Sequence, residues 1–204
     1  MNSVHSRTRL CPLLTLIISL SAFSSSLRGE YIPIAVGDEW TMSALIVSPS
    51  GKASEGVVRR RIDSVAEKDG KTYVRARTWT VGRPKSTEST KLLRKDLNAV
   101  YSVDEGVAGA AEQIEVVLPL KAGAAWQQTV GRKTLTHTVI GLETVDVSGK
   151  TYENCFHIRT TSADGSYTED FWEAPRVGNV KSIIAYGNGA RFTLTLEEFK
   201  CIPH

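Results

Sequence analysis

The stretch that decides the fold reads Gly149-Lys-Thr-Tyr-Glu-Asn-Cys-Phe-His-Ile158 and resumes as Phe171-Trp-Glu-Ala-Pro-Arg-Val-Gly-Asn-Val-Lys181. Aromatic and β-branched residues alternate here with Gly, Asn and Pro, a pattern typical of short strands joined by tight turns. Neither half carries apolar residues at the 3.6-residue spacing of an amphipathic helix. The stretch therefore predicts consecutive antiparallel strands.

The same pattern extends over the rest of the chain. Apolar residues alternate with polar ones from Trp40 to Ile46, and Asp69-Gly70 and Asp164-Gly165 supply the tight turns that join hairpin strands. About eleven segments have strand character, with Lys133 to Ile140 and Glu143 to Val147 as two of them and no strand assigned between Val103 and Trp126. We predict an all-β fold, an antiparallel meander that forms a curved sheet, a half-barrel or a barrel-like domain.

Two motifs occur twice, in the same order. Pro33-x-x-x-Gly37-x-x-Trp40 recurs as Pro119-x-x-x-Gly123-x-x-Trp126, and Gly70-Lys-Thr-Tyr73 recurs as Gly149-Lys-Thr-Tyr152. This order predicts an internal duplication with copies at about 31–112 and 113–204. We expect the proline and glycine to set a turn and the tryptophan to anchor the following strand in the core.

The N-terminus has the pattern of a secretory signal peptide. Arg7 and Arg9 precede an apolar segment from Leu10 to Phe23, and small residues follow it. The segment is shorter than the roughly 20 residues that span a bilayer as a helix. We predict cleavage of residues 1–26, one β domain over residues 27–204, no later transmembrane segment, and a periplasmic or secreted location.

The charge balance indicates no particular partner. Loss of the signal removes Arg7 and Arg9 and no acidic residue, so the formal net charge falls from +3 to +1. A nearly neutral exported protein fits nucleic-acid binding poorly, and none is predicted.

Two cysteines, Cys155 and Cys201, remain after cleavage. An oxidising compartment favours a disulfide between them, and strand parity could place both sulfur atoms on the same side of a sheet. The alternative is two unpaired cysteines that act as small hydrophobic residues.

No catalytic or metal site stands out. Cys155-x-His157 places a thiol and an imidazole on one face of a strand, but a working pair also needs an orienting group and an oxyanion site. No His, Cys or Asp spacing matches a zinc or calcium site. We predict no catalytic residue, no metal and no cofactor, and we expect the protein not to be an enzyme.

Arginines gather on one predicted hairpin. Arg59-Arg60-Arg61 faces Arg75 and Arg77, which could form a basic patch for a polyanion or an anionic lipid head group. Strand residues alternate between faces, so at least one of the three must point the other way. The default interpretation is a solvated strand face with acidic neighbours, namely Glu55, Asp63 and Glu67.

The tryptophans are the only candidate ligand-binding residues. Core packing is the main interpretation of Trp40, Trp79, Trp126 and Trp172. A sheet of this size has an apolar face, however, and the chain offers almost no amphipathic helix to cover it. Either the two copies close on each other, or an apolar ligand or partner fills the concave face.

The quoted motifs resemble a group of exported bacterial β-proteins with repeated Gly-x-x-Trp segments and an Ala-Pro-x-Val-Gly-x-Val-Lys motif, here Ala174 to Lys181. The resemblance covers most of residues 31–199. This group is distantly similar to the half-barrels of periplasmic lipoprotein carriers, which bind acyl chains on a concave sheet. The resemblance implies no catalytic residue.

Three functions fit these observations. The leading hypothesis is a non-enzymatic binding or scaffold protein of the cell envelope, with an apolar small molecule, a lipid-like ligand or an envelope component as its partner. The first alternative is a hydrolase of envelope polymer, which a polar cleft gathering His157, Asp170 or Glu173 would favour. The second is a purely structural assembly module.

Overall fold

The computed structural model describes residues 31–81, 88–131 and 133–201. They form twelve strands, which confirms the all-β prediction of about eleven. Within these residues no helix is long and apolar enough to cross a membrane. The predicted signal segment lies outside them. The strands are β1 Glu39–Val47, β2 Ala53–Lys68, β3 Lys71–Val81, β4 Glu88–Lys95, β5 Ala99–Asp104, β6 Gln113–Val117, β7 Ala125–Val130, β8 Lys133–Val147, β9 Lys150–Ser162, β10 Tyr167–Ala174, β11 Gly178–Tyr186 and β12 Arg191–Lys200.

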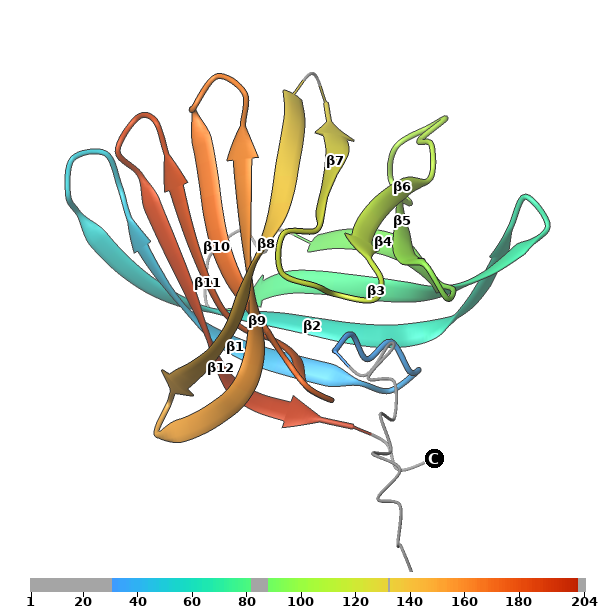
Figure 1. The fold of residues 1–204 in the computed structure, drawn as a ribbon, viewed down its shortest axis with the longest axis horizontal. Coiled ribbons are helices and arrows are strands. Elements are labelled where there is room, and N and C mark those ends of the chain that lie inside the picture. The colour runs from blue at the N-terminus through green and yellow to red at the C-terminus, as the bar shows by residue number, and fades with distance from the viewer. Residues whose placement is uncertain (1–30, 82–87, 132, 202–204) are drawn as a thin grey trace, which may run out of the picture.

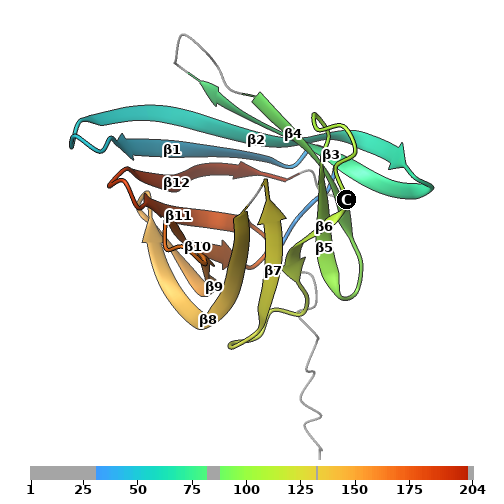
Figure 2. The ribbon, with the colours of Figure 1, turned by 90° about the horizontal axis from the view of Figure 1, so that it is seen from above.

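All strands belong to one antiparallel sheet with the order β6-β5-β4-β3-β2-β1-β12-β11-β10-β9-β8-β7. Strands that follow one another in sequence are paired, except that β6 and β7 do not pair with each other. β1 also pairs with β12 along its whole length. The sheet curls into a nearly closed barrel in which its two edges, β6 and β7, approach each other (Figures 1 and 2). β6 and β7 are therefore not paired by backbone hydrogen bonds of the sheet, and we call the junction between them the seam.

Side chains bridge this seam. The indole N–H of Trp126 donates to the backbone oxygen of Glu115 at 3.2 Å, and the amide of Gln128 donates to the Glu115 carboxylate at 3.2 Å. The backbone N–H of Thr129 donates to Oε1 of Gln113 at 2.9 Å. These bonds satisfy edge groups that a continuous ladder would otherwise pair.

The turn between β10 and β11 anchors the N-terminal segment. The indole N–H of Trp40 donates to the backbone oxygen of Val177 at 2.7 Å. Gly178 has φ 82°, and a Cβ atom there would lie 3.3 Å from Cδ of Pro33. Glycine is needed at this position for the left-handed backbone and for the close approach of Pro33.

The two Pro-x-x-x-Gly-x-x-Trp turns have the same local structure. Gly37 N donates to Ile62 O, and Gly123 N donates to Val139 O, both at 2.8 Å. Both glycines have positive φ, and both tryptophans are buried at the start of a strand. These matching turns agree with the predicted duplication, which otherwise stays a prediction for the two whole copies.

Two details differ from the sequence-based strand assignment. β6 covers Gln113–Val117, where no strand was expected. β8 runs unbroken from Lys133 to Val147, where two strands were expected, because its register shifts at Val139/Gly141 and Glu143/Val145. Each shift changes which residues face the core, so the period of two is interrupted without ending the strand.

The predicted disulfide is not formed. Cys155 is fully buried, Cys201 is exposed, and both thiols are free. Sγ of Cys155 lies 3.3 Å from the backbone oxygen of Tyr152, to which it donates. The parity argument fails because β12 ends at Lys200, so the sheet does not set the direction of the Cys201 side chain.

Candidate functional site: a cavity inside the sheet

The inner face of the curved sheet lines a partly open cavity of about 570 Å³. This volume lies within the range of small-molecule sites, about 300–1,000 Å³. The N-terminal segment lies at one end, where Ile32 and Pro33 line the cavity and Tyr31 packs edge-on against Phe156 at 4.8 Å. Most of the wall is apolar, and its main members are Trp40, Met42, Val58, Leu93, Val100, Val116, Leu135, Phe171 and Leu194.

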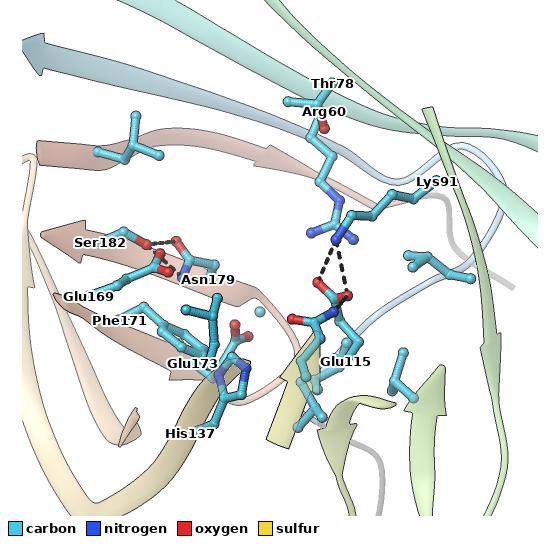
Figure 3. A pocket seen from close by; sticks show the side chains of 18 of the residues that line it. Arg60, Thr78, Lys91, Glu115, His137, Glu169, Phe171, Glu173, Asn179 and Ser182 are labelled. Atoms are coloured by element: carbon cyan, nitrogen blue, oxygen red, sulfur yellow. Dashed lines mark hydrogen bonds and ion pairs between the residues drawn. The ribbon is translucent and has the colours of Figure 1, made fainter. Parts of the chain in front are cut away.

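Ionisable side chains from five strands also reach this cavity (Figure 3). They come from β2, β4, β6, β8 and β10, and we call them the inner polar cluster. Its members are Arg60, Lys91, Glu115, His137, Glu169 and Glu173.

Glu115 has a full set of partners. Nζ of Lys91 lies 3.1 Å from its carboxylate, the hydroxyl of Ser102 donates to it at 2.6 Å, and Gln128 donates at 3.2 Å. Burial alone would raise the pKa of Glu115, but the Lys91 charge and these hydrogen bonds outweigh it and lower the pKa to about 2. Glu115 is therefore ionised and neutralises Lys91.

The two glutamates on β10, Glu169 and Glu173, differ from Glu115 in protonation. Glu173 is 8% exposed, and burial raises its pKa to about 7, although the Arg60 charge and a hydrogen bond with Asn179 oppose the shift. Burial also raises the pKa of Glu169, which accepts a hydrogen bond from the Tyr167 hydroxyl at 2.7 Å. Both carboxyl groups thus hold protons more firmly than exposed glutamates do.

His137 offers the cavity an unused polar atom. Its ring stacks on Trp126 at 4.9 Å, and Nδ1 lies 2.8 Å from the hydroxyl of Thr160. Nε2 is buried and has no hydrogen-bond partner among the described residues. Burial lowers the pKa of His137, so the imidazole is neutral.

Arg60 is the cation of the inner polar cluster that lacks a close acidic partner. Its guanidinium lies over the Trp40 ring, 5.4 Å from the centroid, and extends toward Lys91 and Glu115 (Figure 3). Among the described residues it has no ion pair of its own. The arginines on either side, Arg59 and Arg61, have the opposite strand parity and are exposed.

The structure divides the four candidate tryptophans. Trp40 lines the cavity, and Trp126 lies behind His137. Trp79 lies outside the cavity lining and stacks with Arg77, whose guanidinium carbon is 4.9 Å from its ring centroid. Trp172 also lies outside the lining and stacks on His157 at 4.7 Å. Whether any of them binds a ligand stays a prediction.

His157 and Asp170 come together, but away from the cavity. The two ring nitrogens of His157 lie 2.8 Å from Glu143 and 2.6 Å from Asp170. Burial raises the pKa of the Cys155 thiol to about 11, which disfavours the thiolate. Because both imidazole nitrogens are occupied by carboxylates, His157 is not placed to serve Cys155 as a base.

The outer arginines form ion pairs. Asp63 lies 2.9 Å from Arg77 and 3.5 Å from Arg61, and Glu105 lies 2.6 Å from Arg75. This arrangement matches the default interpretation of a solvated strand face and leaves Arg60 as the member of the triplet that points inward.

No known family model matches the chain, and no curated protein matches its sequence. Three solved structures are similar over most of their own length. A protein described as exported, with a YmcC-like fold, from Bacteroides fragilis is 12% identical, with 84% of this chain and 99% of that one covered and a TM-score of 0.46. A lipoprotein from Parabacteroides distasonis is 13% identical, with 83% and 98% covered and a TM-score of 0.48.

The third is a LolA-superfamily protein from Nitrosomonas europaea, 8% identical, with 86% and 90% covered and a TM-score of 0.37. These structures are of the same kinds as the proteins named in the resemblance found from the sequence, exported β-proteins and proteins related to lipoprotein carriers. Identities this low carry no information on what this chain binds.

Proposed function

We propose that the protein is an extracytoplasmic, non-enzymatic binding protein that carries an apolar or lipid-like ligand inside its curved sheet. The observation that supports this most strongly is the cavity of about 570 Å³ with a mainly apolar wall. A sheet whose inner face is not filled by its own side chains gains stability when an apolar molecule occupies it.

The proposed location rests on the predicted signal segment at residues 1–26. The proposal of a non-enzymatic role is supported by the occupied nitrogens of His157 and by the raised pKa of the Cys155 thiol. Of the three residues named for a hydrolase site, Glu173 lines the cavity, whereas His157 and Asp170 lie together outside its lining.

A cavity-filling substitution tests the proposal. Leu194 lines the cavity, whereas Thr193, its neighbour on β12, lies on the other face of the sheet. We expect Leu194→Trp to weaken binding of the neutral probe N-phenylnaphthylamine at least about tenfold, because the indole occupies the ligand volume. Thr193→Trp is the matched control and should bind like the unmodified protein. Equal binding by both variants, with both folded by circular dichroism, would contradict the proposal.

A further inference from the structure

The inner polar cluster holds more positive than negative charge when Glu169 and Glu173 carry protons, because Arg60 and Lys91 then face only the Glu115 carboxylate. Lys91 is neutralised by Glu115 at 3.1 Å. Lys133, at the margin of the cavity, pairs with Asp164 at 3.8 Å and donates to Ser166 at 2.6 Å. Within the described part of the chain, Arg60 forms no ion pair within 4.0 Å. Its guanidinium lies over the Trp40 ring, and its charge reaches Glu115 and Glu173 only over a longer distance, where it lowers the pKa of both.

A guanidinium without an ion pair in a mainly apolar cavity is costly. A half-buried cation loses part of its hydration free energy, and the cation–π interaction with an aromatic ring compensates for only part of this loss. A hydrogen bond to a charged group typically changes an equilibrium constant by about tenfold or more, so an anion placed at Arg60 would contribute strongly to binding.

His137 adds a second unsatisfied group in the same cavity. The side chain is more than nine-tenths buried, and Nε2 has no partner among the described residues. When the Thr160 hydroxyl donates to Nδ1, Nε2 carries the proton and becomes a hydrogen-bond donor. A ligand oxygen could accept that hydrogen bond.

Resting on the proposed function, we infer that the ligand is a single-chain amphiphile with an anionic head group, which pairs with Arg60 while its alkyl chain lies along the apolar wall. A carboxylate and a phosphate monoester share the required chemistry: a compact oxyanion that can accept two hydrogen bonds from a guanidinium. His137 lines the same cavity, and its Nε2 has no hydrogen-bond partner among the described residues.

The test compares four dodecyl compounds that share one chain. Laurate and dodecyl phosphate are anionic, dodecanol is neutral, and dodecyltrimethylammonium is cationic. Each displaces N-phenylnaphthylamine from the exported, processed protein. We expect at least one anion to bind about tenfold or more tightly than dodecanol, and the cation to bind weakest. The tighter of the two anions identifies a fatty-acid or a phospholipid-type head group.

Variants at two neighbouring arginines assign the effect. Arg60→Met should remove the preference for the anion, and Arg60→Lys should keep part of that preference. Arg59→Met is the matched control on the opposite face and should change nothing. Probe binding with no anion preference, or a preference that survives Arg60→Met, would overturn this inference and leave the proposed function standing. A protein that binds neither the probe nor any of the four compounds would overturn both.

Discussion

At the scale of single residues, the parity of one strand places acids on an apolar face. Tyr167, Glu169, Phe171 and Glu173 alternate along β10 and all line the cavity. Burial raises the pKa of both glutamates, so the folded state favours their protonated, uncharged forms. Glu173 is therefore a source of pH-dependent stability.

The sign follows from the direction of the Glu173 shift. Its pKa rises from an ordinary 4.5 to about 7 on folding, so the stability it contributes is present below about pH 4.5 and is lost as the pH rises through about 7. We expect Glu173→Gln to be more stable than the unmodified protein at about pH 8, by up to about 3 kcal/mol, and to show a flatter pH dependence.

Urea unfolding between about pH 5 and pH 8 measures this effect. Glu153→Gln on β9 is the control, because Glu153 is exposed. An unchanged pH slope in Glu173→Gln would show that Glu173 is ionised in the folded protein throughout this range.

The sequence identified few of the cavity residues. Strand alternation predicted that at least one arginine of Arg59-Arg60-Arg61 points away from the others, and Arg60 is the one that points into the cavity. His137 and Glu115 were missed, because single polar residues in an alternating strand look like solvent-facing ones. For the acidic residues of β10 the sequence did carry a signal, because Glu169 and Glu173 share the strand parity of the apolar Phe171 and so face the same side.

At the scale of elements, hairpins were predictable and irregular strands were not. Asp69-Gly70 and Ser148-Gly149 adopt positive φ and join β2 to β3 and β8 to β9, as turn chemistry predicts. β6 was missed because its five residues lie at the sheet edge, where Gln113 and Glu115 bond across the seam. Those contacts depend on β7, which lies beyond the next loop.

The turn before β7 supplies a prediction at this scale. Gly123 has φ 81° with open space where a Cβ atom would stand, whereas Gly141 in β8 has equally open space and no positive φ. Gly123→Ala should therefore lower the free energy of unfolding by about 1 to 2 kcal/mol. Gly141→Ala should leave it unchanged or slightly higher. Equal losses in urea unfolding would show that φ does not limit residue choice at Gly123.

At the scale of the whole molecule, the open seam and the predicted duplication are related. If the boundary between the copies is placed after β6 rather than at the predicted residue 112, each copy has six strands, β1 corresponds to β7 and β12 corresponds to β6. The β1–β12 ladder and the β6–β7 seam would then be equivalent junctions, of which only the first is a continuous ladder. The second is held by the side-chain bonds of Trp126, Gln128 and Thr129.

The central claim is that a ligand occupies the inside of the curved sheet. A crystal structure with laurate brominated at its terminal carbon tests it directly, because the bromine marks the chain by anomalous scattering. The account predicts one bromine peak between the apolar side chains of Leu194 and Phe171, with the carboxylate at Arg60. Bromine confined to the outer surface, or an interior filled by the protein's own side chains, would contradict it.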